Sequence, residues 1–261
     1  MSKDWKLNEA TSVPSIDRFT AEPWLWRAQT KLDGLRCAIE FSLTGFAKYA
    51  HTKGGQKVPA QLPEEGPAGA VVDGELLGTT GDLAGALSAL AKRDFRTWHP
   101  FDVAWQSDGV QERCFDDRMS WLASYGGRYE GVRALTHLDV AKGWEHVVAR
   151  GLEGIVIRGA DGGYSSPSFK VKQSREIICW ASSGKLLLSI SPLGGEGWTA
   201  VGSCPESYAG LVLVRCEGVH ESLRLRAPQV LRTVETATFP TLEQAERMYA
   251  RQRQAEGTGD A

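Results

Sequence analysis

Lys31-Leu32-Asp33-Gly34-Leu35-Arg36 places a lysine amine directly before an Asp-Gly turn. After the turn, apolar residues alternate with polar ones as on a strand with one buried face: Leu35, Cys37, Ile39 and Phe41. A lysine nucleophile must be held rigidly and kept partly neutral, and a buried position beside other cations does both. The same residues are also typical of a β-hairpin turn flanked by surface charges, so this stretch alone leaves both interpretations open.

The composition indicates a globular chain. Its 261 residues are 42% hydrophobic, enough for one large domain or two smaller ones. No run is long and apolar enough to cross a membrane, and the polar N-terminus lacks the apolar core of a signal peptide. We therefore expect a cytoplasmic protein, of a cell or a virus-infected cell, with no membrane partner. The net charge of −2 neither indicates nor excludes a polyanionic partner, because binding depends on where basic residues cluster.

Five scattered cysteines without Cys-x-x-Cys spacing argue against a disulfide framework and a structural zinc site.

The sequence pattern differs between the first and the second part of the chain. Up to about residue 173 the pattern predicts a hairpin over 34–51, strands over 70–77 and 155–157, and helices over 83–92, 116–124 and 140–150. Beyond it, short strands are expected over 186–190, 198–201, 211–216 and 223–225, followed by a helix over 241–254. We therefore expect a first domain over 1–173, a small barrel over 174–255 and a disordered tail over 256–261.

Four further segments carry charge in a pattern that nucleotidyl transfer needs. They are Asp73-Gly74-Glu75, Phe101-Asp102, Glu153-Gly154 and Lys170-Val171-Lys172. Taken singly, each has a structural interpretation as turn residues, core or a solvated strand edge. Two carboxylates or two ammonium groups placed two residues apart on a strand would share one face, however, as a phosphate or metal site requires.

Taken in this order, the segments resemble the superfamily of ATP-dependent DNA ligases, RNA ligases and mRNA capping enzymes. The resemblance covers roughly residues 20–175, from the Lys-x-Asp-Gly-x-Arg motif to the Lys-x-Lys motif. It implies an α+β fold: a nucleotidyltransferase (ATP-grasp-like ligase) domain of antiparallel sheets with flanking helices, followed by an all-β OB-fold barrel.

The resemblance also implies roles for individual residues. Lys31 would attack the α-phosphorus of ATP and carry AMP covalently, while Lys170 and Lys172 neutralise the phosphate as catalytic residues. Arg36 and Glu75 would hold the ribose and Phe101 would stack on adenine. Gln29 and Thr30 would complete the cofactor site. Glu153, with Glu75 or Asp102, would position Mg²⁺.

The polynucleotide implied by the resemblance is nicked double-stranded DNA. AMP would pass to a 5′-phosphate, and a 3′-hydroxyl would then displace AMP and seal the strand. Thr52-Lys53-Gly54 resembles the motif that binds the nick phosphate. The residues expected on DNA phosphates are Lys53, Arg224, Arg226 and Arg232.

Several details favour an ATP-dependent DNA ligase of the minimal two-domain type, acting as a monomer. About thirty residues precede Lys31, too few for the extra domain of NAD-dependent ligases. Phe101-Asp102 has the DNA-ligase form, and no Trp stands between the paired lysines. The alternatives are an RNA ligase or capping-type enzyme and a non-catalytic OB-fold nucleic-acid binder. One departure is Val234–Ala237, where the family's Arg-x-Asp-Lys motif would fall, so that Arg226 or Arg232 substitutes or adenylation is slow.

Overall fold

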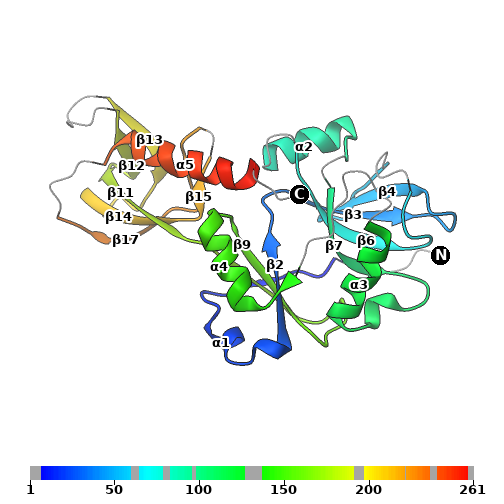
Figure 1. Ribbon diagram of the computed structural model, residues 1–261. Helices are drawn as coiled ribbons and strands as arrows, with labels where there is room; N and C mark the ends of the chain where they lie inside the picture. Colours follow the sequence, from blue (N-terminus) through cyan, green and yellow to red (C-terminus); the bar gives the residue numbers. More distant parts are fainter. Residues whose placement is uncertain are drawn as a thin grey trace. The chain divides into compact units, whose positions relative to one another are not determined.

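The computed structural model describes residues 7–59, 65–78, 83–95, 98–126, 137–190, 197–220, 222–235 and 240–257. By their contacts these residues form two compact units. The first contains the described residues up to Ala149 together with Gly154–Val171, and the second contains Arg150–Glu153 and the described residues from Lys172 onward. Figure 1 labels many of the helices and strands of both units. Of the expected tail over 256–261, residues 258–261 lie outside the described part, and the last helix extends to Gly257.

One sheet of the first unit carries the Lys31 strand. Its order is β1 (Thr11–Ser12), β10 (Ser168–Lys172), β9 (Gly154–Gly159), β2 (Trp26–Lys31) and β8 (His137–Leu138). β2 and β9 are antiparallel, with Lys31 opposite Gly154. β9 buries Ile155 and Ile157 completely, which anchors the centre of this sheet.

A second sheet of the first unit carries the strand that follows the motif. Its order is β5 (Lys57–Pro59), β4 (Ala47–Thr52), β3 (Leu35–Phe41), β6 (Val71–Leu76) and β7 (Trp98–Trp105), with every pair antiparallel. The predicted alternation is confirmed, because Cys37, Ile39 and Phe41 lie in the main hydrophobic core. Helices α2 (Leu83–Lys92) and α3 (Phe115–Gly126) pack against that core.

The Asp-Gly turn is not a hairpin turn. β2 and β3 belong to different sheets, so the chain crosses from one sheet to the other between Lys31 and Leu35. Gly34 permits this crossing, since a Cβ there would overlap the Leu76 carbonyl oxygen and lie 2.7 Å from Leu77 Cδ2. The hairpin interpretation of the motif is therefore wrong. The glycine is needed for close approach of two chain segments.

The predicted helices are confirmed within a few residues. α2 has the expected bounds, α3 is one to two residues longer at each end, and α4 (Val140–Arg150) ends before Gly151, whose φ of +65° suits a glycine. Short helical turns complete the unit: α1 (Asp17–Thr20), η1 (Pro23–Leu25) and η2 (Val110–Glu112). Phe19, Trp26 and Phe169 form an aromatic cluster with ring centroids 5.0 to 5.9 Å apart.

The second unit is built on one antiparallel sheet. Its order is β13 (Trp198–Ser203), β12 (Lys185–Ser189), β11 (Arg175–Ser182), β14 (Gly210–Cys216) and β17 (Gln229–Thr233). A two-stranded sheet pairs β15 (Gly218–Val219) with β16 (Leu225–Arg226), and helix α5 (Leu242–Gly257) contributes Ala245 to the core. The all-β prediction with one helix is confirmed, but the described strands do not close into a barrel.

The central strand β11 was not expected from the sequence. Its inward residues Ile177, Cys179 and Ala181 are buried, but Ile178 and Trp180 between them are apolar as well, so the alternation was hidden.

None of the described helices is long and apolar enough to span a membrane.

Candidate active site

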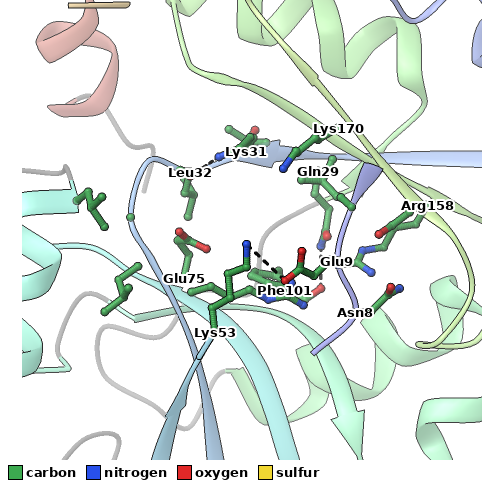
Figure 2. Close-up of a pocket in the computed structure, with 18 residues that line it drawn as sticks. Asn8, Glu9, Gln29, Lys31, Leu32, Lys53, Glu75, Phe101, Arg158 and Lys170 are labelled. Atoms are coloured by element: carbon green, nitrogen blue, oxygen red, sulfur yellow. Dashed lines mark hydrogen bonds and ion pairs between the residues drawn. The ribbon is translucent and has the colours of Figure 1, made fainter. Parts of the chain in front are cut away.

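A cavity of about 350 Å³ in the first unit brings together most of the residues singled out in the sequence (Figure 2). The sheet of β2 and β10 contributes Gln29, Thr30, Lys31 and Lys170. The sheet of β3, β6 and β7, with the turn after β4, contributes Arg36, Glu75, Phe101 and Lys53. Eight residues spread over 142 positions of sequence therefore line one cavity of the size that small-molecule sites have.

Lys31 is the last residue of β2 and its side chain lies in the cavity wall. Its Nζ donates to the Leu32 carbonyl oxygen at 3.3 Å. Strand pairing with Gly154 on one side and the tight crossing at Gly34 on the other hold the backbone at this point. The amine is thus carried by rigid backbone, as a nucleophile needs.

Arg36 is clamped by buried partners. Its Nε and Nη2 donate to Asp73 Oδ1 and Oδ2 at 3.2 and 2.5 Å, and Nη2 also donates to the Tyr164 hydroxyl at 3.3 Å. Burial alone would lower the pKa of Arg36, but the Asp73 carboxylate outweighs it and raises the pKa above its ordinary value. Burial and the same carboxylate raise the pKa of Tyr164. Arg36 therefore presents a fixed, permanent positive charge to the cavity.

Phe101 and Gln29 form another part of the wall. Gln29 Nε2 donates to the Phe101 carbonyl oxygen at 3.0 Å, and since that oxygen can only accept, the orientation of the amide is determined. Two guanidinium groups lie close to the Phe101 ring, with Arg36 Cζ 5.6 Å and Arg158 Cζ 5.7 Å from its centroid. A ring held in this way offers a flat face for stacking.

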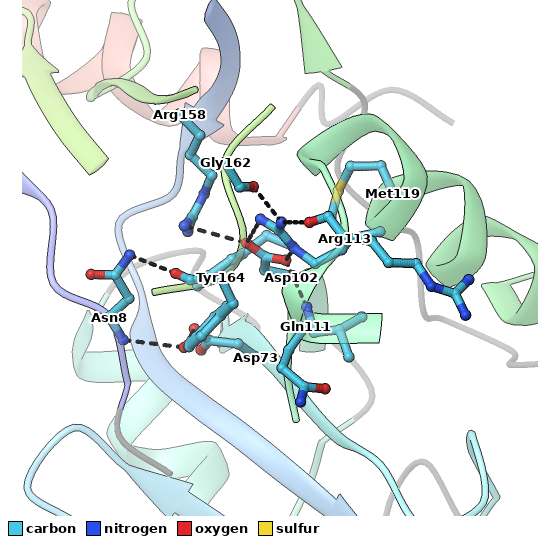
Figure 3. A network of polar contacts seen from close by, with 12 residues as sticks. Asn8, Asp73, Asp102, Gln111, Arg113, Met119, Arg158, Gly162 and Tyr164 are labelled. Atoms are coloured by element: carbon cyan, nitrogen blue, oxygen red, sulfur yellow. Dashed lines mark hydrogen bonds and ion pairs between the residues drawn. The ribbon is translucent and has the colours of Figure 1, made fainter. Parts of the chain in front are cut away.

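The Asp102 side chain is bound by donor groups of the protein itself (Figure 3). Its fully buried carboxylate pairs with Arg118 Nε at 2.7 Å and Nη2 at 3.1 Å, and with Arg158 Nη1 at 3.3 Å. It also accepts the Val103 backbone N–H at 2.8 Å. Both carboxylate oxygens thus accept hydrogen bonds or ion pairs from protein donors, which disfavours Asp102 as a metal ligand.

Among the cavity-wall residues that sequence reasoning missed are two buried polar ones, Arg158 and Ser168. Both are at least nine-tenths buried, and Arg158 Nε and Ser168 Oγ have no hydrogen-bond partner within the described structure. Buried donors of this kind are rare unless a ligand or water satisfies them. Strand periodicity could have revealed Arg158, because it shares a face of β9 with Val156, which also lines the cavity.

The second unit holds the remaining predicted residues. Lys172 Nζ pairs with Glu153 Oε1 at 3.3 Å and with Glu217 Oε2 at 2.6 Å. Burial opposes the charge of Lys172, but the Glu217 hydrogen bond and the Glu153 charge prevail and raise its pKa. Arg224 and Arg232 are exposed, and Arg226 is half-buried on β16. Within the described residues, no three His, Cys, Asp or Glu side chains are grouped as a metal site.

Solved structures similar to this chain include DNA ligases. A Lig E DNA ligase matches with a TM-score of 0.60 and 19% identity, covering 88% of this chain and 99% of its own. A mycobacterial DNA ligase D complexed with ATP matches with a TM-score of 0.51 and 18% identity, covering 92% of this chain and 99% of its own. This chain has the ligase fold.

The ligase fold is recognisable here from structure. The ligase domain of LigD from M. tuberculosis also matches, with a TM-score of 0.50, 18% identity, and coverage of 88% of this chain and 98% of its own. No protein-family model and no curated protein matches the chain by sequence. The fold is thus shared with these structures at 18–19% sequence identity.

Proposed function

We propose that this protein is an ATP-dependent DNA ligase that seals 5′-phosphate/3′-hydroxyl nicks in duplex DNA, acting as a monomer. The observation that carries the proposal is the cavity in which Lys31 from one sheet is joined by Arg36 and Glu75 from the other. The shared fold with DNA ligases supports it, and one of these is a complex with ATP.

Two polar groups of the cavity wall support a nucleotide as the ligand. Because Gln29 Nε2 is bound to Phe101, the Gln29 carbonyl oxygen is the end of the amide that can accept from a base. Arg158 Nε is a donor without a hydrogen-bond partner among the residues that the structure describes. Adenine offers an amine donor beside ring-nitrogen acceptors, which matches one acceptor and one donor in the wall. Phe101 would stack on the base and Arg36 with Glu75 would hold the ribose.

The chemistry begins at Lys31. Its Nζ forms a bond to the α-phosphorus of ATP while the bond from that phosphorus to the pyrophosphate oxygen breaks, and the amine gives up a proton. Lys170, which lines the same cavity, offsets negative charge on the phosphate, and Lys172 is proposed for the same role. Thr30 lies beside Lys31 in the wall.

The next two steps transfer AMP and seal the nick. A 5′-phosphate oxygen of DNA attacks the AMP phosphorus and the phosphorus–nitrogen bond to Lys31 breaks. The 3′-hydroxyl then attacks the 5′-phosphorus, releasing AMP and forming the phosphodiester. We propose Lys53, at the cavity, for the 5′-phosphate and Arg224, Arg226 and Arg232 for the DNA backbone.

Glu75 and Glu153 would hold Mg²⁺. This ion is usually bound by one or two carboxylates together with substrate phosphates, and Glu75 lines the cavity proposed for the phosphates. Its contribution would be to neutralise charge that builds on the phosphates.

The test is transfer of label to the protein. Incubation with α-labelled ATP and Mg²⁺ should leave label on the chain after denaturing electrophoresis, and Lys31→Ala should abolish it. Lys142→Ala is the matched control, since that lysine lies exposed on α4. Label from GTP alone would indicate a capping-type enzyme, and no label would indicate a non-catalytic binder.

The substrate is tested in a second experiment. Labelled protein is mixed with nicked DNA, nicked RNA or a nicked DNA–RNA hybrid. Sealing of nicked DNA supports the proposal, whereas sealing of RNA alone would replace it with an RNA ligase.

A further inference from the structure

The hydroxyl of Tyr164 lies between Asn8 of the N-terminal segment and Asp73 (Figure 3), and it also contacts Arg36. It donates to Asp73 Oδ2 at 2.6 Å and accepts from Arg36 Nη2 at 3.3 Å and from the Asn8 backbone N–H at 3.2 Å. A carboxylate can only accept, and a guanidinium and a backbone N–H can only donate. The hydroxyl proton therefore points at Asp73, and the orientation of the phenol is determined by its partners.

Tyr164 does not itself line the cavity described above. It lies in the connection between β9 and β10, is 3% exposed, and packs against Ala38, Val71 and Ala104. Any influence on a bound nucleotide must therefore pass through another residue. Arg36 is that residue, because it touches Tyr164 on one side and lines the cavity on the other.

The hydroxyl completes the support of the Arg36 guanidinium. Asp73 Oδ2 receives both Tyr164 and Arg36 Nη2, while Oδ1 receives Arg36 Nε. With the hydroxyl in place, rotation of the buried carboxylate would break two contacts to Oδ2. Without it, the carboxylate and the guanidinium can turn together, and the face that Arg36 presents to the cavity is less well defined.

The N-terminal segment holds Tyr164 from the opposite side. Asn8 Nδ2 donates to the carbonyl oxygens of Tyr164 and Ser166 at 2.8 and 2.7 Å. The segment is fixed in turn by β1, where Thr11 and Ser12 pair in parallel with β10. Asn8 also lines the cavity, so the segment that fixes Tyr164 belongs to the nucleotide site.

We propose that Tyr164, held by Asn8, is a positioning residue that orients Arg36 toward the sugar of the nucleotide. This inference rests on the proposed function, because it assumes that the cavity binds ATP with its ribose at Arg36. It assigns a role to a residue outside the sequence motifs. It also makes recognition of the sugar depend on the N-terminal segment.

The experiment measures sugar selectivity, defined as the ratio of the Kd for 2′-deoxy-ATP or 3′-deoxy-ATP to the Kd for ATP. Binding is measured by calorimetry in the Lys31→Ala background, which removes covalent transfer. Tyr164→Phe deletes only the hydroxyl oxygen. We expect it to weaken ATP binding about three- to tenfold and the deoxy analogues about twofold or less, so that the selectivity falls.

Matched variants separate positioning from general damage. Tyr49→Phe removes the hydroxyl of a tyrosine that is 41% exposed on β4 and should leave the selectivity unchanged. Asn8→Ala should lower the selectivity in the same direction by a smaller factor. In an Arg36→Ala background, Tyr164→Phe should have no further effect on it, because its route to the sugar is gone.

Each outcome is decisive. Equal weakening of ATP and both deoxy analogues by Tyr164→Phe, or no weakening, overturns the positioning role. A further loss of selectivity in the Arg36→Ala background overturns the route through Arg36. If the unmodified site binds no ATP, or if Lys31 takes no label, the proposed function fails instead. A thermal melt of each variant confirms that binding is compared between folded proteins.

Discussion

Asp73 and Asp102 lie opposite each other on β6 and β7, and each of these fully buried carboxylates has its own arginine. Asp73 pairs with Arg36, and Asp102 with Arg118, whose side chain is 1% exposed. Two buried negative charges on neighbouring strands would be strongly destabilising without these partners. The arginines thus make this part of the sheet possible, and the energetic consequences can be measured.

Arg118→Met is expected to destabilise the fold by about 3–5 kcal/mol, because it leaves a buried carboxylate with Arg158 as its remaining arginine. Urea unfolding measures the change. Arg113→Met is the control: that side chain is 46% exposed, and its backbone carbonyl, which Arg118 uses, is retained. A loss below about 1 kcal/mol for Arg118→Met would contradict the expected cost of removing this partner from a buried carboxylate.

The Mg²⁺ dependence of self-adenylation should change in a Glu75 variant but not in an Asp102 variant. Glu75→Gln removes a cavity carboxylate and is expected to raise the Mg²⁺ concentration needed for half-maximal self-adenylation. Asp102→Asn is expected to lower stability without moving that midpoint, since its oxygens bind Arg118 and Arg158. A shifted midpoint in Asp102→Asn would return Asp102 to the metal set.

Gly34→Ala should impair both stability and adenylation. The added methyl would overlap the Leu76 carbonyl and lie 2.9 Å from Glu75 Cγ, so the crossing between the sheets must move, at a cost of about 1–3 kcal/mol. Gly54→Ala is the control for stability, because the nearest atom to its Cβ would be Thr52 Oγ1 at 3.9 Å. Thermal unfolding and labelling by ATP report the two effects. Equal melting temperatures for both variants would rule out the close approach at Gly34 as a constraint.

Cys37 predicts an alkaline loss of stability. Burial, with the Asp73 and Glu75 charges, raises the pKa of the Cys37 thiol to about 12. In the unfolded chain a thiol ionises near pH 8.5, so the folded state favours the protonated form. This stabilisation is complete below about pH 8.5 and is lost progressively as pH rises toward 12.

The measurement compares unfolding free energies at pH 7.5 and 9.5. The unmodified protein should lose about 1 kcal/mol more between these values than Cys37→Ala does. Cys114→Ala, at a half-exposed site, is the control and should follow the unmodified protein. Parallel pH profiles for all three proteins would contradict the prediction.

Local patterns in the sequence predicted much of the first unit. The alternation from Leu35 to Phe41 gave a strand with a buried face, and the helix ending before Gly151 followed from its C-terminal glycine. These features depend on neighbours within a few residues, so they can be read from a short window.

What the sequence did not reveal depends on contacts between distant segments. An Asp-Gly pair serves equally in a hairpin and in a crossing between sheets, and the Leu76 carbonyl that distinguishes them lies 42 residues after Gly34. The Asp102–Arg118 pair likewise joins a strand to a helix. Asp102 in isolation therefore read as a possible metal ligand, although its partners are guanidinium groups.

The crossing between Lys31 and Arg36 has a consequence for how this protein can vary. Four residues separate the proposed attacking amine of Lys31 on one sheet from the proposed sugar-binding Arg36 on the other. A link this short leaves almost no slack, so adding or deleting one residue would misalign the two groups, even if both sheets folded intact. The number of residues between Lys31 and Arg36 thus determines how these two side chains are placed relative to each other. We expect insertions and deletions to be tolerated in exposed turns but not in this segment.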